Sequence, residues 1–258
     1  MLVSVVMAAR DAEATIGEAV RSVVDQSHRD WELLVVDDGS TDSTLDVIRG
    51  FGEGRIRVLE PGRIGVLAQL RNLAIAEARG EWIAFLDADD VWLPKKLGLQ
   101  LAAAGDAGLV HTDAYRLVDG RSEHVPVRRP AGPLVPALVE NNFVYSSSVL
   151  VRRALLEEHG AFDPDPALFG SPDYELWLRL APFTEFAYVD EPLLLYRVHG
   201  GQMSADLVRM VEGTIAALRK SAPPGPERDR RLRALRLQRL KARLTRARGL
   251  NLLGGGNS

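Results

Sequence analysis

Two apolar runs that each stop at a group of carboxylates constrain the fold of this chain most. Residues 33–36 (Leu-Leu-Val-Val) lead into Asp37-Asp38-Gly39-Ser40, and residues 82–86 (Trp-Ile-Ala-Phe-Leu) lead into Asp87-Ala88-Asp89-Asp90. Short, continuously apolar runs are typical of strands that a parallel sheet buries on both faces. The carboxyl ends of such strands meet at one edge of an open α/β sheet, where ligands bind. The sequence therefore predicts an α/β fold with both acidic groups at one site.

The two acidic groups indicate a bound cation, because neither has Lys or Arg beside it in the sequence. Mg²⁺ and Mn²⁺ prefer oxygen ligands, and a diphosphate would fill their remaining positions. In an extended segment, Asp87 and Asp89 would point to the same side. Simpler alternatives stay open: a solvated turn for Asp87-Ala88-Asp89, and a turn with helix caps for Asp37-Asp38-Gly39-Ser40.

The composition limits the kinds of fold and site that this chain can form. The chain has 258 residues, long enough for one large α/β domain with a helical appendage, and it has no Cys. The absence of Cys excludes a disulfide framework, a thiolate metal site and a Cys nucleophile. The apolar opening at residues 2–9 is too short for a signal peptide or a membrane span, so we expect it to form the first buried strand.

Strand and helix signals alternate through the first half of the chain, as βαβ units require. A Pro- and Arg-rich stretch at residues 119–136 has no clean period, and we expect a loop there. The expected strands lie near residues 3–8, 32–36, 56–59, 82–86, 109–112 and 144–151. The expected helices lie near residues 15–25, 44–48, 67–78, 95–101, 153–159 and 173–180.

The C-terminal region differs in charge from the rest of the chain. Residues 221–258 hold ten Lys or Arg and two acids, although the whole chain has a net charge of −3. Five leucines (Leu232, Leu235, Leu237, Leu240, Leu244) approximate one face of a helix. This basic helix, at residues 228–248, could pack on the domain, pair with a second subunit or dock on an anionic membrane. Nucleic-acid binding is not expected, because no recognition motif accompanies the charge.

Three further positions have an ordinary and a functional interpretation. Arg71, beside Asn72, could be a surface residue or could face a diphosphate in an acidic cleft. Asp173 starts a helix, where a negative charge interacts favourably with the helix dipole. It could instead act as a general base. His199 could be a plain loop residue or a metal ligand.

A series of short motifs occurs along residues 2–204. They are VSVVM at 3–7, SVVDQS at 22–27, VVDDGSTDST at 35–44, RNLA at 71–74, GEWIAFLDADD at 80–90, GAFD at 160–163, DYELWLRL at 173–180 and YRVH at 196–199. In this order, they resemble the motifs of family 2 glycosyltransferases of the GT-A type.

The resemblance implies a GT-A fold, with a Rossmann-like, mostly parallel sheet flanked by helices. It implies one glycosyltransferase domain at residues 1–204. Within it, residues 1–112 would form the nucleotide-sugar-binding half and residues 113–204 the acceptor-binding half. A helical, basic extension would follow at residues 205–258.

The resemblance also implies the reaction. A metal-dependent, inverting glycosyltransferase would move a sugar from a UDP- or dTDP-sugar to an acceptor hydroxyl by direct displacement, with Mn²⁺ or Mg²⁺. The acceptor would be a carbohydrate, a lipid-linked molecule or a small molecule, as in polysaccharide biosynthesis. We expect a cytoplasmic protein, with peripheral contact to the inner face of the membrane as an open option.

Site residues follow position by position from the resemblance. Asp173 would take the proton of the acceptor hydroxyl, and Asp89 and His199 would bind the metal. The nucleotide would contact a larger set: Ala8, Ala9, Arg10, Asp11, Asp38, Gly39, Arg71, Asp87 and Ala88.

The chain departs from the family pattern at two places. The usual Pro-Thr-Tyr-Asn after the first strand is Ala8-Ala9-Arg10-Asp11 here, so an aromatic contact to the base is missing and the nucleobase stays open. In the family, a Glu usually precedes the catalytic base, and Pro172 stands at that position here. Proline is compatible with a helix start, so Asp173 is kept as the candidate base.

Other functions compete with glycosyl transfer. A haloacid-dehalogenase-like phosphatase would use Asp87 and Asp89 in a D-x-D-x-V motif, but two βα units precede this motif and the downstream Lys and acidic pair are not evident. A sugar nucleotidyltransferase needs a Gly-rich basic loop that residues 8–14 do not supply. A non-catalytic nucleotide-binding module is the remaining alternative.

Overall fold

The computed structural model describes residues 1–118, 121–126, 134–200 and 206–247. Its strands are β1 (Val3–Ala9), β2 (Trp31–Asp37), β3 (Ile56–Leu59), β4 (Trp82–Phe85), β5 (Val91–Trp92), β6 (Leu109–Val118), β7 (Arg121–Val125), β8 (Leu150–Arg152) and β9 (Phe186–Val198). Its α-helices are α1 (Ile16–Val24), α2 (Thr44–Arg49), α3 (Leu67–Glu77), α4 (Lys96–Ala103), α5 (Leu134–Glu140), α6 (Arg153–His159), α7 (Pro172–Leu180), α8 (Leu207–Ser221) and α9 (Pro226–Ala247), and its 3₁₀ turns are η1 (Ser146–Ser148) and η2 (Pro166–Leu168).

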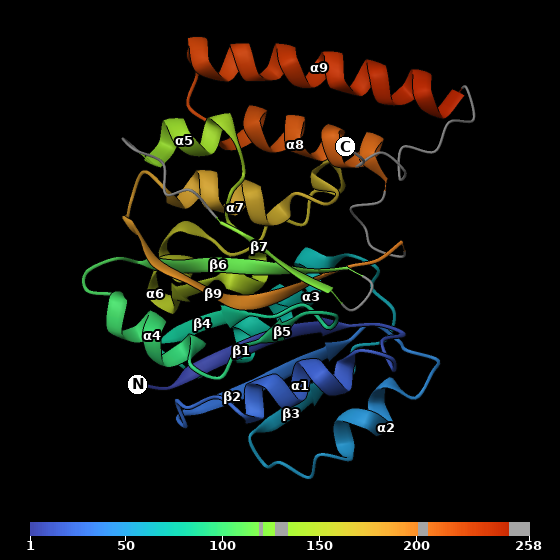
Figure 1. Ribbon diagram of the computed structural model, residues 1–258, viewed down its shortest axis with the longest axis vertical. Helices are drawn as coiled ribbons and strands as arrows, with labels where there is room; N and C mark the ends of the chain where they lie inside the picture. The colour runs from blue at the N-terminus through green and yellow to red at the C-terminus, as the bar shows by residue number, and fades with distance from the viewer. Residues whose placement is uncertain (119–120, 127–133, 201–205, 248–258) are drawn as a thin grey trace.

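The described strands form one sheet in the order β3-β2-β1-β4-β8-β6-β9-β5, with β7 paired to β6. Strands β3, β2, β1 and β4 are parallel, whereas β8 runs antiparallel to both β4 and β6. Helices lie on both faces of this sheet, as Figure 1 shows. The predicted α/β fold is confirmed.

Register places the two acidic groups at one edge of the sheet. Ala9 of β1 is level with Asp37 of β2, and Val6 is level with Phe85 of β4. The chain therefore leaves β2 and β4 on the same side, where the residues after each strand are acidic. The predicted meeting of the two strand ends is confirmed.

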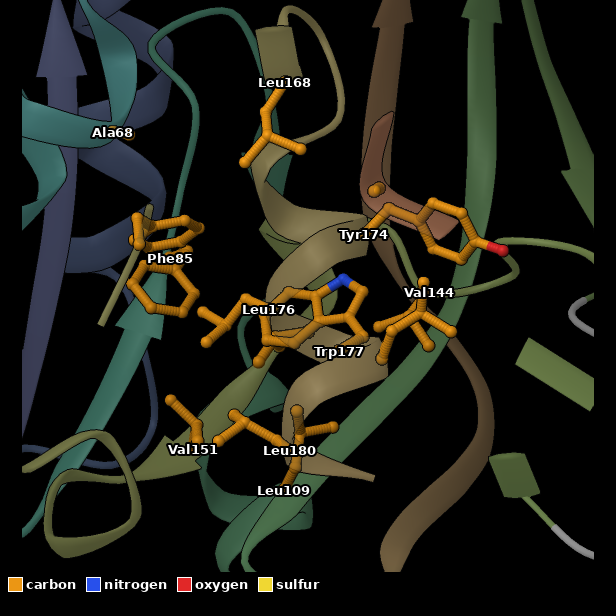
Figure 2. Close-up of a cluster of buried hydrophobic side chains, with 14 of the residues drawn as sticks. Ala68, Phe85, Leu109, Val144, Val151, Leu168, Tyr174, Leu176, Trp177 and Leu180 are labelled. Carbon is orange, nitrogen blue, oxygen red and sulfur yellow. The ribbon is translucent and has the colours of Figure 1, made fainter. Parts of the chain in front are cut away.

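Alternate residues of the central strands enter two cores, one on each face of the sheet. Val5 and Met7 pack with the apolar face of α1, whereas Val6 packs with α3 and α7. Figure 2 shows the second core, where Trp177 of α7 lies between Phe85 and Val144. Burial on both faces explains why the runs in β1, β2 and β4 are apolar throughout.

The predicted loop at residues 119–136 is wrong in part. Residues 119–120 and 127–133 lie outside the described residues, but β7 forms a hairpin with β6 and α5 begins at Leu134. Residues 121–124 of β7 are exposed. Such an edge strand does not need apolar residues, so its sequence carries no strand pattern.

Two strand boundaries also differ from the prediction. The expected strand at 144–151 is reduced to β8, because Ser148 turns back and donates from Oγ to the Tyr145 carbonyl at 2.7 Å, within the 3₁₀ turn η1. Strand β6 continues to Val118 because it pairs along its length with the long, unpredicted strand β9. The polar Asp190-Glu191-Pro192 segment interrupts the apolar pattern of β9 and the register of this pairing.

The C-terminal helices form the outer layers on one side of the protein. Helix α8 packs on α7, and α9 packs on α8 and α5 (Figure 1). Leu232 and Leu235 of α9 are buried, whereas Leu237, Leu240 and Leu244 are exposed. The predicted single leucine face is therefore wrong, because the two sets lie on opposite sides of the helix. Across the described part of the chain, no helix is both long and apolar enough to cross a membrane.

Candidate active site

The segment after β4 is a turn that separates its carboxylates. The amide of Asp90 donates to the carbonyl of Asp87 at 3.1 Å, which closes the turn. The amide of Asp87 donates to Ser147 Oγ at 3.1 Å. The segment is not extended, so Asp87 and Asp89 have different partners.

Asp87 pairs with a buried arginine. Arg71 of α3 donates from Nη2 to Asp87 Oδ1 at 2.6 Å, and its side chain is only 4% exposed. The guanidinium carbon also lies 5.0 Å from the centre of the Phe162 ring. Arg71 is therefore not the surface residue of the simpler interpretation. Asp87 remains 37% exposed and can still contact a ligand.

Asp89 meets His199 at the end of β9. The distance between Asp89 Oδ2 and His199 Nε2 is 3.0 Å. Burial and the charge of Asp87 raise the pKa of Asp89, while the hydrogen bond to His199 opposes this shift. Negative charge thus accumulates at this turn, which a cation would relieve.

Asp89 and His199 are the residues that could hold a divalent cation here. Asp89 offers a carboxylate oxygen and His199 an imidazole nitrogen, both of which divalent cations such as Mg²⁺ and Mn²⁺ accept. Among the described residues, no three His, Asp or Glu side chains gather into a cation site. The described protein groups therefore offer two ligands, and oxygens of a phosphate-bearing ligand and water would complete the shell.

Asp173 stands at the start of α7. The helix begins at Pro172, one residue before the expected start, and Asp173 accepts from the amide of Tyr174 at 2.8 Å. Burial raises the pKa of Asp173 to about 6, while the positive charge of Arg71 opposes the shift and the charge of Asp87 adds to it. A carboxylate with this pKa is suited to general-base chemistry near neutral pH.

Arg71 therefore connects two of the predicted site residues. It holds Asp87 by a hydrogen bond and acts electrostatically on Asp173. The structure brings Arg71, Asp87 and Asp173 together, and it brings Asp89 to His199. These five residues come from four separate motifs of the sequence, and only Asp87 and Asp89 share one.

The end of β2 organises a neighbouring loop. Buried Asp38 accepts from the amides of Ile64 and Gly65 at 2.5 and 2.9 Å, and its own amide donates to the Ala9 carbonyl at 2.9 Å. Gly39 has a φ of +71°, which favours glycine. Asp38 thus ties the ends of β1 and β2 to the loop that precedes α3.

The segment after β1 is held by the segment that follows β2. Asp11 has a φ of +44°, and its Oδ1 accepts from the amide of Thr41 at 2.8 Å. Arg10 is exposed and its Nε lies 3.3 Å from Asp11 Oδ2. Ala8 is half-buried and Ala9 is buried. The side chain of Arg10 therefore faces solvent at the edge where the acidic groups meet.

Two residues near the site were not assigned from the sequence. Arg197 donates from its amide to Asp90 Oδ1 at 3.0 Å and from Nε to the Asp89 carbonyl at 2.9 Å. Ser147 supports the amide of Asp87. The signals were present: serines at 146–148 interrupt an apolar run, and Arg197 lies in a motif used only for His199.

The loop after α6 is fixed from two helices. Asn72 of α3 donates from Nδ2 to the Phe162 carbonyl at 2.7 Å and accepts from the Phe162 amide at 2.9 Å. Arg179 of α7 donates to the carbonyls of Gly160 and Ala161 at 2.8 and 2.7 Å. These bonds keep the Phe162 ring against Arg71.

Comparison with known proteins identifies the family. The model of "Glycosyl transferase family 2" matches residues 4–160. The chain belongs to this family. The enzyme is therefore a glycosyltransferase, as its curated relatives are also named.

Two curated relatives are similar over most of their length. The Escherichia coli protein WfgD, named UDP-Glc:alpha-D-GlcNAc-diphosphoundecaprenol beta-1,3-glucosyltransferase, is 42% identical over 181 residues, which is 69% of each chain. The Bacillus subtilis protein TuaG, a putative teichuronic acid biosynthesis glycosyltransferase, is 31% identical over 211 residues, 80% of this chain and 82% of its own.

Solved structures show the same fold. TarS of S. aureus in complex with UDP-GlcNAc has a TM-score of 0.71 at 20% identity, over 95% of this chain and 73% of its own. A mannosyltransferase from Pyrobaculum calidifontis in complex with GDP-Man and Mn²⁺ has a TM-score of 0.69 at 19% identity, over 95% of this chain and 72% of its own. The GT-A fold is confirmed, and family membership excludes the phosphatase, nucleotidyltransferase and non-catalytic alternatives.

Proposed function

We propose that this glycosyltransferase moves a sugar from a nucleotide diphosphate sugar to an acceptor hydroxyl by direct displacement, with inversion and with a divalent cation. The observation that carries the proposal is the grouping of Asp173, Arg71 and Asp87 at the sheet edge. It joins a base whose pKa is about 6 to an arginine and a partly exposed carboxylate.

The donor would be bound mainly by residues at the carboxyl ends of β1, β2 and β4. The nucleoside would contact the segment from Ala8 to Asp11, together with Asp38 and Gly39. Arg71 would face the diphosphate, and Asp87 and Ala88 would support the ribose. Asp87 is suited to this role because one of its oxygens is bound by Arg71 and the carboxylate is still 37% exposed.

Asp89 and His199 would hold Mg²⁺ or Mn²⁺. When bound, the cation would act as a Lewis acid that stabilises the charge on the departing diphosphate. The pair would offer the cation one carboxylate oxygen and one imidazole nitrogen. Support also comes from the mannosyltransferase relative in fold, whose structure contains Mn²⁺.

Asp173 would act as the general base. Its carboxylate would take the proton of the acceptor hydroxyl while the hydroxyl oxygen bonds to the anomeric carbon and the bond from that carbon to the diphosphate oxygen breaks. The products would be the glycosylated acceptor and the nucleoside diphosphate. Because the attack comes from the face opposite the leaving group, one displacement inverts the anomeric centre.

The relatives suggest the donor and acceptor classes. WfgD is named for UDP-Glc and a diphosphoundecaprenol-linked sugar, and TuaG for the biosynthesis of a polysaccharide. We infer that this chain uses a UDP-hexose, with a dTDP-sugar as the alternative, and a lipid-linked acceptor in polysaccharide biosynthesis. Such a role would place it in the cytoplasm, at the inner face of the membrane.

Donor binding tests the metal assignment. Calorimetric titration with UDP-glucose and with dTDP-glucose, each with Mn²⁺ or with EDTA, should show binding that depends on the cation. Asp89→Ala and His199→Ala should each weaken that binding by about 10-fold or more. Asp106→Ala, an exposed carboxylate in the turn before β6, is the matched control and should bind normally. Equal affinity with Mn²⁺ and with EDTA in the parent protein would remove the metal from the proposal.

A further inference from the structure

The outward face of α9 carries an unusual apolar stripe. Leu237, Leu240 and Leu244 follow each other at three- and four-residue spacing, so they share one side of the helix. Their exposed fractions are 62%, 55% and 51%. Leu232, Leu235 and Ala242 are buried against the protein on the opposite side. The packing of α9 therefore holds the stripe away from the other residues that the structure describes.

Positive charge surrounds this stripe. No acid follows Asp229 in the sequence of α9, and Arg233, Arg236 and Lys241 are exposed beside the leucines. Within the described residues these three make no ion pair, whereas Arg230 pairs with Glu140, and Arg239 and Arg243 pair with Glu212. The helix thus uses part of its charge in docking to the protein and leaves a second part facing outward.

The position of α9 makes this face accessible. The helix is the outermost layer of the protein, and α8 and α5 lie beneath it (Figure 1). The sequence of α9 is far too polar for this helix to cross a bilayer. An apolar stripe between basic residues is instead compatible with a helix that lies in the plane of a membrane interface.

We propose that α9 docks this protein on an anionic membrane surface. Leu237, Leu240 and Leu244 enter the boundary between headgroups and acyl chains, and Arg233, Arg236 and Lys241 meet the lipid phosphates. The long aliphatic stems of the basic residues allow their charged ends to reach the headgroups while the leucines are inserted. Attraction of the basic residues to anionic lipid adds to the burial of the leucines.

A second copy of the chain fits this face less well. A two-fold interface would place the same surface on both subunits, so Arg233, Arg236 and Lys241 of one copy would oppose those of the other. Like charges across an interface disfavour association. An anionic surface has the complementary charge, and the helix offers it both apolar and basic groups.

Vesicle flotation with the full chain tests the proposal. Vesicles of phosphatidylcholine are compared with vesicles that also contain phosphatidylglycerol, without donor or acceptor. We expect flotation only with the anionic vesicles. Leu237→Gln/Leu240→Gln/Leu244→Gln and Arg233→Gln/Arg236→Gln/Lys241→Gln should each lower the bound fraction by about 10-fold or more. Salt should weaken binding of the parent protein, because screening reduces the attraction to anionic lipid.

A matched control removes three positive charges elsewhere. The variant Arg21→Gln/Arg49→Gln/Lys95→Gln changes three exposed residues outside α9. It has the same net charge as the α9 charge variant and should float like the parent protein. Circular dichroism verifies that each variant is folded. Equal flotation of the control and the α9 charge variant, or none of the parent protein, would overturn the proposal. A dimer of the parent chain that the leucine variant converts to monomer would assign the face to a second copy instead.

Because the flotation assay contains no nucleotide sugar, its outcome is separate from that of the proposed reaction. An enzyme that binds donor but not vesicles would refute only the docking surface. An enzyme that floats but does not bind donor would refute only the proposed function.

Discussion

Arg71 Nη2 lies 2.6 Å from Asp87 Oδ1, and the same guanidinium lowers the pKa of Asp173 against the effect of burial. One buried cation thus orients a carboxylate after β4 and adjusts a second carboxylate at the start of α7. The charge of Asp87 acts on Asp173 in the opposite direction. The balance among these three groups determines in which pH range the base of the proposed reaction is ionised.

Replacement of Arg71 should shift that balance. In Arg71→Met the pKa of Asp173 should rise, because the positive charge that opposes its burial is gone while Asp87 remains. The midpoint of the pH–rate profile should therefore move to higher pH, and loss of the bond to Asp87 should cost about 1.5–3 kcal/mol of unfolding free energy. Arg71→Lys keeps the charge and should leave the midpoint nearer that of the parent enzyme. An unchanged midpoint in Arg71→Met would contradict the coupling.

Transfer should depend on the ionised form of Asp173. The rate of glycosyl transfer should rise with pH through about 6 and then level off, because the base is active only when deprotonated. Asp173→Asn should lower transfer by about 10²-fold or more with little change in donor affinity. The comparison variant is Asp106→Asn, which changes an exposed carboxylate in the turn before β6. Near-normal turnover of Asp173→Asn would assign the base to another carboxylate, with Asp163, Asp165 and Glu175 the next candidates.

The same substitution should stabilise the fold. The pKa of Asp173 is raised from 3.8 to about 6 on folding, so the folded state favours the protonated form and loses stability as pH rises through this range. Asp173→Asn removes the penalty, and its amide oxygen can still accept from the Tyr174 amide. Urea unfolding should therefore show the variant more stable than the parent protein at neutral pH. The difference should disappear as pH approaches about 4. A difference that stays constant across this range would show that ionisation of Asp173 is not its cause.

The attachment of α8 depends on one glycine. The Phe169 carbonyl approaches Gly213 so closely that an added methyl group would collide with backbone. Gly213→Ala should therefore lower the unfolding free energy by about 1–3 kcal/mol. Gly98→Ala is the matched control in α4, where the nearest atom to the added methyl group is Ser27 Oγ at 3.6 Å. That variant should be as stable as the parent or gain about 0.5–1 kcal/mol. Equal thermal denaturation midpoints of the two variants would mean that α8 can shift away from Phe169 without loss of unfolding free energy.

The parts predicted correctly from the sequence are those that local pattern determines. Runs such as residues 33–36 and 82–86 are apolar throughout because β2 and β4 are covered on both faces. The carboxylates after them could be placed at one edge, because parallel strands bring their carboxyl ends together. The helix predicted at residues 173–180 was likewise a local property of the chain, and α7 begins only one residue earlier, at Pro172. The roles of the individual carboxylates at this edge of the sheet remain predictions.

Other features follow from contacts between distant segments. Asp89 and His199 are 110 residues apart, and they meet because β9 pairs with β5, directly after the acidic turn. Neither strand was predicted, since β5 has only two residues and β9 is interrupted by polar ones. The support of Asp87 by Ser147 depends in the same way on the placement of η1 beside β4.

Sequence by itself therefore determined the class of fold, the family motifs and the edge at which the acidic groups stand, because each is encoded in runs of neighbouring residues. Only the tertiary structure decided which partner each acid has, how far the pKa of Asp173 rises and which leucines of α9 face outward. Those properties depend on burial, on charges such as Arg71 from other elements and on the packing of α9 against α8. None of these follows from the spacing of residues along the chain.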